Sequence, residues 1–486
     1  MLDRRAFLKI AGATPAWFAA CAGGSLLERV PSSTGSVVND VHSGLNSTPV
    51  SRLLRPASNI DVRRAILAAR ERGARLSISG SRHAMGGQQF LRSGWMLDLR
   101  GLDRIVSFDP DRGHLTVGAG ARWPRVLEFL ATTRGEDGAG WTIVQKPVGV
   151  DEVTVGGSLA SNVHGMALGR GPIVADVERF AMIGATGDPR IVTREENSDL
   201  FRLAIGGYGL FGPIVEVTLR LRERVKVRKI VSEESVESAI QLLRDRTVTG
   251  DLYGEFILSV EEESYLNYLR DGVLTTWRRV DFETPMPGDQ VAITEEDWTE
   301  WMELAHTGPR VADRRRFERR LDTDGQILWS DEIQLARYRE GYHDLIETRG
   351  PVSPGSETMT EVFLPTVAVP GFMSAARAIL RTSTTPVVRC SIRLCEKDET
   401  TFLAWARQPF ACVAFDLHVD DTHVGREVAE ATVRELIDEA LERDGTFYLT
   451  YGRAARISQV RAAYPQFEDF LRMKLHHDPA EIFQSD

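Results

Sequence analysis

Three glycine-rich clusters, at residues 80–88, 156–165 and 206–212, restrict the fold of this chain more than any other feature. Glycine has no Cβ atom, so the backbone there can turn sharply and lie close to a bound molecule. One such cluster can be a plain turn whose small residues serve packing. Three clusters within residues 50–222 instead favour a shared ligand site on one domain.

The third cluster, Gly207-x-Gly209-x-x-Gly212, has the letters of a dinucleotide-binding fingerprint. That fingerprint has to open a helix, whose N-terminus meets the pyrophosphate. Here Pro213 follows, and residues 215–221 then alternate between apolar and polar side chains, which predicts a strand. The context therefore argues against a nicotinamide-binding Rossmann domain, although a large flat cofactor can still lie against this bare backbone.

The other two clusters carry polar side chains. In the segment Thr154–Gly165, successive backbone amides can form a concave site for a pyrophosphate. Its neutral donors are Ser158, Ser161, Asn162 and His164. The first cluster continues a predicted strand, Ala74–Ser79, into a tight turn with His83, whose imidazole is a candidate nucleophile, base or ligand.

Length, charge and cysteine content bound the class of protein. A chain of 486 residues is expected to hold about two or three domains. The net charge of −10 argues against a nucleic-acid partner, because phosphate binding needs a basic surface. Cys390, Cys395 and Cys412 have no zinc-site spacing, so no metal site is expected; one disulfide or buried free thiols both fit them.

The N-terminus predicts export. Asp3–Lys9, with Arg4 and Arg5, matches a twin-arginine signal, although an amphipathic helix is an alternative. The following Phe18-Ala-Ala-Cys21 resembles a lipoprotein box with Phe in place of the usual Leu. Lipidation of Cys21 or ordinary cleavage nearby are both open. We expect a periplasmic or membrane-anchored protein, with residues 1–21 as signal and 22–48 as a polar linker.

Periodicity and charge divide the rest of the chain. Residues 49–224 form the glycine-rich domain, and a charged segment, 222–229, marks its end. Residues 225–440 alternate strands and helices as a second domain, with a long connection expected at 283–308. An amphipathic helix is expected at Arg426–Arg443. Residues 441–486 form a C-terminal segment.

Four segments together resemble the vanillyl-alcohol-oxidase and p-cresol methylhydroxylase (PCMH) superfamily. Gly80–Gln88 is similar to the loop of cytokinin dehydrogenases that carries a flavin-linked histidine. Val155–Gly165 resembles the pyrophosphate loop of decaprenylphosphoryl-ribose oxidase and of aldonolactone and alditol oxidases. Ile205–Gly212 resembles the family's glycine loop near the adenine and flavin side, and Asp478–Phe483 its closing segment.

The resemblance implies an α+β fold: a two-subdomain PCMH-type domain that binds FAD, a separate α/β cap domain, and a C-terminal segment returning to the FAD domain. The implied FAD-binding residues are Ser79, Gly80, Ser81, Arg82, His83, Ala84, Gln88, Gly156, Gly157, Ser158, Ser161, Asn162, His164, Gly165, Gly207, Gly212 and Ile214. His83 can bond covalently to the flavin, hydrogen-bond to it, or be structural. A second attachment is not expected, because no cysteine lies near residues 162–171.

Three residues are candidates for the substrate side. Tyr448–Arg453 looks like the segment of decaprenylphosphoryl-ribose oxidase that carries a catalytic lysine. Tyr451 falls where that lysine would be, so the lysine's role does not carry over, and Arg453 is the alternative cation near the flavin. Asp416 lies on a predicted strand, 413–419, in the cap sheet that usually floors the substrate pocket.

The expected activity is oxidation of an alcohol-type small molecule, such as a sugar, alditol or lactone, by hydride transfer to flavin N5. The electron acceptor, whether oxygen, a quinone or a carrier protein, is open. Two alternatives are a flavin dehydrogenase or reductase that serves a quinone or carrier, and an exported lipoprotein of this fold that binds a ligand without catalysis.

Overall fold

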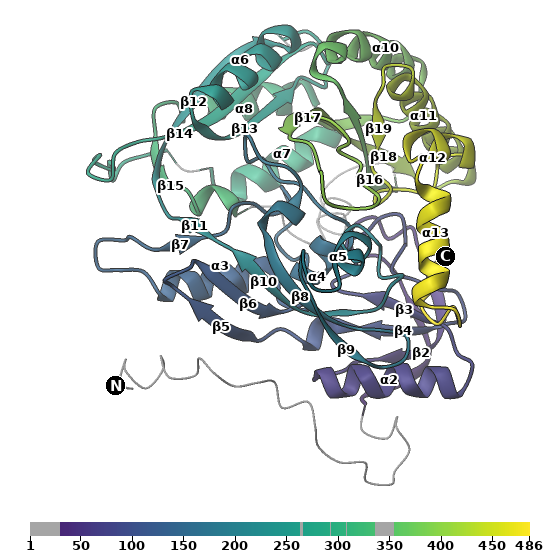
Figure 1. The fold of residues 1–486 in the computed structure, drawn as a ribbon. Coiled ribbons are helices and arrows are strands. Elements are labelled where there is room, and N and C mark those ends of the chain that lie inside the picture. The colour runs from purple at the N-terminus through teal and green to yellow at the C-terminus, as the bar shows by residue number, and fades with distance from the viewer. Residues whose placement is uncertain (1–29, 263–265, 292, 308, 336–353) are drawn as a thin grey trace.

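The computed structural model describes residues 30–262, 266–291, 293–307, 309–335 and 354–486 (Figure 1). The predicted export signal, Cys21 and the first part of the predicted linker lie outside these residues. Among the described helices, none combines the length and the apolar character that crossing a bilayer requires.

The first sheet leads into the His83 loop. Its strands, in spatial order, are β1 (Ser32–Val38), β2 (Thr48–Leu54), β4 (Trp95–Asp98) and β3 (Leu76–Ser79). Helix α2 (Asn59–Glu71) begins after Ser58, whose hydroxyl caps the helix by accepting a hydrogen bond from the Asp61 N–H.

The linker prediction for residues 22–48 is wrong over β1. This strand pairs antiparallel with β2 along Ser32–Val38. It is an edge strand, mostly exposed, that backbone hydrogen bonds hold in place. Because its residues are mostly polar, their pattern did not predict a strand here.

The second sheet is antiparallel and contains the strand after the third glycine cluster. Its strands, in spatial order, are β5 (Ile105–Asp109), β6 (His114–Gly118), β10 (Ile214–Arg220), β8 (Val177–Ile183) and β9 (Pro189–Val192). The same part of the chain also contains helices α3 (Trp123–Thr132), α4 (Val155–Ala160) and α5 (Ser198–Ala204). β10 begins two residues after Gly212, which confirms that this cluster does not open a Rossmann helix. A short ribbon joins β7 (Trp141–Thr142) to β11 (Arg222–Glu223).

An eight-stranded sheet dominates the upper half of Figure 1. In spatial order its strands are β15 (Ile327–Trp329), β12 (Lys226–Ser235), β14 (Asp271–Arg279), β13 (Asp251–Leu258), β17 (Val387–Cys395), β18 (Phe410–Asp420), β16 (Gly355–Leu364) and β19 (Thr446–Phe447). Its helices are α6 (Val236–Val248), α7 (Glu295–Thr307), α8 (Pro309–Leu321), α10 (Val369–Thr382) and α11 (His423–Leu441).

The two faces of this sheet have different coverings. Phe256 and Leu258 of β13 join a core cluster that includes Leu243 of α6 and Leu436 of α11; we call this the outer face. Ile257 points the opposite way and packs with Phe317 of α8, on what we call the inner face. Register places Ser391, Ala414 and Glu361 on the inner face as well.

The predicted long connection at 283–308 is also wrong, because α7 begins at Glu295. Pro285, Pro287 and Gly288 favoured a connection, but a helix begins a few residues after them. Its first turn holds Glu295, Glu296 and Asp297. Carboxylates at that end stabilise the positive pole of the helix dipole.

The C-terminal segment, with helices α12 (Ile457–Ala463) and α13 (Phe467–His477), ends beside β3. The Leu76 N–H donates to the Ile482 carbonyl at 2.7 Å, and the Gln484 N–H donates to the Leu76 carbonyl at 2.9 Å. Asp478, which is buried, accepts from the N–H groups of Ile482 and Phe483 and pairs with Lys474. This carboxylate fixes the turn that brings the chain back to the strand before the His83 loop.

We expect Asp478→Ala to lower the free energy of unfolding by about 1–3 kcal/mol, because two buried N–H donors lose their acceptor. Urea unfolding followed by circular dichroism measures this loss. Asp469→Ala, at an exposed position of α13, is the matched control and should change little. Equal effects of the two substitutions would contradict the role given to Asp478.

Candidate functional site

All three glycine clusters meet at one pocket. Its empty volume is about 1260 Å³, including space open to solvent, and its lining also includes Met359 of β16 and residues that follow β19. Of the residues expected to hold a cofactor, the pocket brings together Ser79, Gly80, Ser81, Arg82, His83, Ala84, Gln88, Gly156, Gly157, Ser161, Gly212 and Ile214. A concave site of this size suits a large cofactor together with a small molecule.

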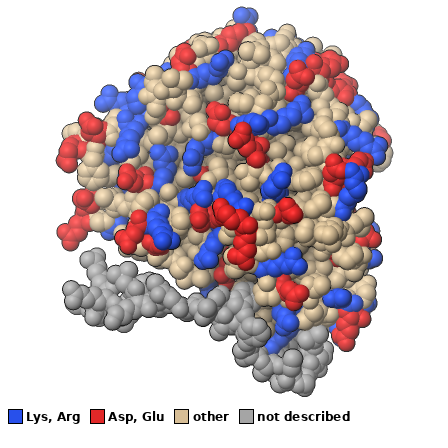
Figure 2. Space-filling model, viewed as in Figure 1, with Lys and Arg blue, Asp and Glu red and all other residues tan. Residues whose placement is uncertain are grey.

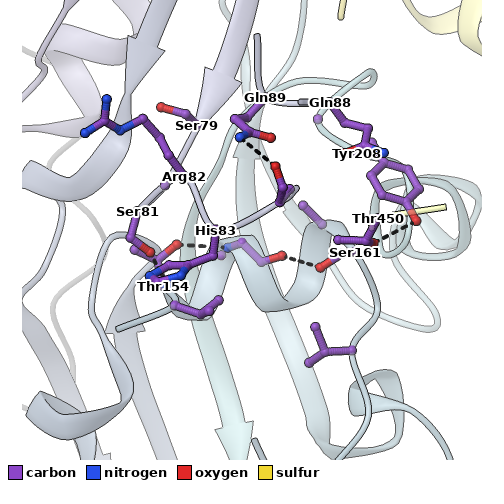
Figure 3. A pocket seen from close by; sticks show the side chains of 18 of the residues that line it. Ser79, Ser81, Arg82, His83, Gln88, Gln89, Thr154, Ser161, Tyr208 and Thr450 are labelled. Carbon is purple, nitrogen blue, oxygen red and sulfur yellow. Dashed lines mark hydrogen bonds between the residues drawn. The ribbon is translucent and has the colours of Figure 1, made fainter. Parts of the chain in front are cut away.

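The His83 loop lies tightly against the start of α4. A Cβ atom on Gly80 would come within 2.1 Å of Thr154 Oγ1, so only glycine fits there. The Thr154 N–H donates to Ser81 Oγ at 3.2 Å, and Arg82 takes a left-handed conformation with φ of 65°. Figure 3 shows the His83 ring beside Ser81 and Thr154, with Arg82 pointing away from it.

Residues from the predicted linker hold the other side of this loop. The Val41 N–H donates to the Arg82 carbonyl at 3.0 Å, and Asn46 Nδ2 donates to the Met85 carbonyl at 2.6 Å. His42, from the same segment, lines the pocket. Sequence reasoning missed His42, because the polar composition of residues 22–48 gave no reason to place them at a site.

The second cluster is a short helix rather than an open loop. Thr154 caps α4 by accepting from the Gly157 N–H, and the Ser158 N–H donates to the Thr154 carbonyl. The Gly156 N–H donates to the carbonyl of Ala119. These amides are used within the protein, so the expected amide concavity is not formed by them, and the cluster contributes a close bare surface instead. Threonine is a favoured N-cap residue, so its place just before the glycines was a sequence signal that could have identified Thr154.

Five of the expected cofactor residues lie outside the pocket lining: Ser158, Asn162, His164, Gly165 and Gly207. Ser158 Oγ accepts from Trp123 Nε1 at 3.1 Å, and Asn162 Nδ2 donates to Asp398 at 2.8 Å. Their side chains support the pocket from behind. Sequence could not show this, because the partners lie far away along the chain.

His164 belongs to a buried cluster with Glu361 and Cys412. Its Nε2 lies 2.9 Å from Glu361 Oε1. Burial alone lowers the pKa of His164, but the neighbouring Cys412 and Glu361 outweigh it and raise that pKa well above its usual value. His164 therefore pairs with the eight-stranded sheet rather than facing the pocket. Cys390, Cys395 and Cys412 are all free and buried, so the buried-thiol interpretation holds and the disulfide does not.

The three substrate-side candidates lie in different places. Tyr451 lines the pocket, and its pKa is raised by burial and by Glu361, which keeps the phenol protonated. Asp416 lies one strand behind Met359, 3.7 Å from Arg389, and burial raises its pKa to about 6. Arg453 is exposed and donates to the carbonyls of Gly86 and Gly87 on the outside of the His83 loop. It braces that loop and is absent from the pocket lining, so the expectation that Arg453 is a cation inside the pocket is not met.

Several buried polar atoms of the pocket have no hydrogen-bond partner among the described residues: Ser79 Oγ, Arg82 Nε, Gln88 Oε1 and Gln89 Oε1. Buried polar atoms in proteins are nearly always paired. Bare glycine walls beside such atoms fit a flat, polar molecule, and FAD has that character. Sequence reasoning also missed Tyr208 and Thr450, whose hydroxyls lie 3.2 Å apart at the edge of the pocket.

Comparisons with known proteins agree with this geometry. The profile of the FAD binding domain family matches residues 50–192. An uncharacterized oxidoreductase in the fasciation locus of Rhodococcoides fascians is 32% identical over 34% of this chain and 36% of its own. Cytokinin dehydrogenase 2 of Arabidopsis thaliana is 24% identical over 54% of this chain and 50% of its own. The chain thus spans about a third to a half of these two relatives.

A longer match, to L-gulono-1,4-lactone dehydrogenase of Mycobacterium tuberculosis, is 24% identical over 90% of this chain and 94% of the relative. The expected likeness to the PCMH-type flavoproteins is confirmed, and FAD is the cofactor of this chain.

We expect Gly80→Ala to yield protein with little FAD, because the new Cβ and Thr154 Oγ1 cannot both keep their positions. The ratio of visible flavin absorbance to ultraviolet protein absorbance measures the bound cofactor. Gly288→Ala is the control, since nothing lies within 4 Å of its added Cβ. Full flavin content in Gly80→Ala would show that the loop can move away from α4.

Asp416 makes a pH-dependent contribution to stability. Its native pKa of about 6 lies above the usual 3.8, so the native state holds this proton over that interval while the unfolded chain releases it. Stability from this group is complete below about pH 4 and is lost as the pH rises through 6. Asp416→Asn should remove this loss, gaining up to about 2 kcal/mol relative to wild type between pH 4 and pH 7. Urea unfolding at the two pH values tests it, and a difference between the proteins that does not change with pH contradicts it.

Proposed function

We propose that this protein is an FAD-dependent oxidoreductase that oxidises a hydroxyl-bearing small molecule of the sugar or sugar-lactone class. One observation carries the proposal: besides the three glycine clusters, the pocket lining includes Met359 of the eight-stranded sheet and Tyr451. A cofactor pocket with a second, separately built wall leaves room for a substrate against the flavin. In this arrangement the two smaller sheets are the FAD-binding subdomains and the eight-stranded sheet is the cap.

The cofactor supplies the chemistry of accepting a hydride. The chain supplies position and exclusion of water. Ser79, Arg82 and Gln88 offer buried polar atoms to the bound cofactor. Tyr448, Tyr451 and Met359 line the same pocket from β16 and from the segment after β19. Tyr451 stays protonated beside Glu361, so it can donate a hydrogen bond to a substrate hydroxyl and does not act as the base.

Support for the substrate class comes from the likeness to a lactone dehydrogenase over nearly the whole chain. The uncharged hydroxyl donors of the pocket, Tyr451 and Thr450, suit a polyhydroxylated ligand. We further propose that the protein is exported by the twin-arginine route and that a covalent link between His83 and the flavin keeps the cofactor in place outside the cytoplasm.

The covalent link has a direct test. When the wild-type holoprotein is precipitated with acid, the yellow colour should stay with the pellet, and His83→Ala should release it to the supernatant. His42→Ala, at the other pocket histidine, should keep the colour in the pellet. Colour in the wild-type supernatant would show that His83 holds the flavin without a bond.

Activity is tested by anaerobic mixing of the yellow holoprotein with sugars, alditols and aldonolactones. Bleaching of the flavin by at least one of them is the expected result. Return of the colour with oxygen and release of peroxide identify an oxidase, and return only with a quinone analogue identifies a dehydrogenase. A purified protein without colour would falsify the enzyme proposal and favour a ligand-binding protein.

A further inference from the structure

Four arginines gather on the inner face of the eight-stranded sheet. Arg389 and Arg393 project from β17, and Arg316 and Arg320 approach from α8, which packs here through Phe317. Arg316, Arg320 and Arg393 are each 8% exposed or less. On the surface view of Figure 2, by contrast, basic and acidic side chains are interspersed. A concentration of buried guanidinium groups is expensive unless anions balance it.

The carboxylates around this arginine cluster balance only part of its charge. Glu255 accepts from Arg393 at 2.7 Å and from Arg389 at 2.9 Å, and Asp416 lies 3.7 Å from Arg389. Arg316 pairs with Asp313. Burial raises the pKa of Glu255, yet Arg393, Arg389 and Arg320 together hold it at about 2. The cluster thus keeps a net positive charge even with these partners in place.

Arg320 is the arginine of this cluster that has no ion-pair partner among the described residues. Within the described parts of the chain its guanidinium has no ion pair or hydrogen bond, and its buried Nε has no acceptor. Nε of Arg316 is in the same situation. Nearby Lys229 has Asp324 as its counter-charge, and burial together with Arg320 lowers its pKa to about 7. Four guanidinium groups therefore face the three carboxylates of Glu255, Asp416 and Asp313, while Glu361 on the same face pairs with His164. The excess is about one positive charge, centred on Arg320.

The arginine cluster adjoins the proposed substrate space. Met359 lines the pocket, Asp416 is its partner on β18, and Arg389 is the partner of Asp416 on β17. Neighbouring strands lie about 4.8 Å apart, so two strand spacings put the Cα atoms of Arg389 and Met359 roughly 10 Å apart. Arg393 and Asp416 also act electrostatically on Tyr451, a second pocket residue.

We propose that this arginine cluster is the subsite for a carboxylate group of the substrate, with Arg320 as its principal ligand. The inference rests on the proposed function and narrows it to an acid of the sugar class. One unbalanced charge matches a monoanion better than a phosphate ester. The planar fork of a guanidinium also binds a carboxylate through two parallel hydrogen bonds.

The test compares ligands that differ only in the charged group. Aldonates of five and six carbons, such as D-gluconate, are titrated into the holoprotein against their alditols, such as D-glucitol, and against glucose 6-phosphate. Binding is followed by the flavin difference spectrum and by the rise of the thermal unfolding midpoint. In wild type the best aldonate should bind at least about tenfold more tightly than its alditol, since hydrogen bonds to charged groups are strong.

Arg320→Met should remove this preference and leave alditol binding within about threefold of wild type. Arg315→Met, an exposed position of the same helix, is the matched control and should keep the preference. Without ligand, the unfolding midpoint of Arg320→Met should equal or exceed that of wild type, because an unpaired buried charge is removed.

Several outcomes overturn the proposal: no aldonate in the panel binds better than its alditol, glucose 6-phosphate binds best, or Arg320→Met keeps the preference. A lower unfolding midpoint with an intact preference shows an arginine that only fixes α8 to the sheet. These outcomes are distinct from failure of the proposed function, which a colourless protein or an unbleached flavin would show.

Discussion

The contact between the Gly80 backbone and Thr154 is the constraint on which the rest of the site depends. It joins the end of β3 to the start of α4, and thereby brings two glycine clusters that are far apart in the sequence to the same pocket. No side chain fits between them. His83 comes three residues after Gly80, and the residue before it, Arg82, takes a left-handed conformation.

Local features of the site were predictable from sequence, and long-range ones were not. Glycine spacing and the strand after Gly212 are written in neighbouring residues, so the pocket walls and the absence of a Rossmann helix could be foreseen. The Glu361 partner of His164 and the bracing role of Arg453 depend on elements that meet only after folding. β1 was missed for a related reason, since backbone pairing stabilises an exposed edge strand without an apolar pattern.

The two faces of the eight-stranded sheet differ in composition and in what they contact. The outer face is apolar and packs with α6 and α11, as an ordinary sheet does against helices. The inner face combines arginines, carboxylates and Tyr253 with a smaller apolar patch beneath α8. Such a face is costly to bury unless its charges have partners. Its polar character therefore reflects what it meets, namely the pocket and the segment that contains His164.

The return of the C-terminal segment to β3 has a consequence for biosynthesis. Leu76 pairs with Phe483, so the eight-stranded sheet and the segment after it must be synthesised before β3 gains this neighbour. The strand that leads into the His83 loop is therefore completed long after its own residues leave the ribosome. Insertion of the flavin into a finished site then follows the synthesis of the eight-stranded sheet.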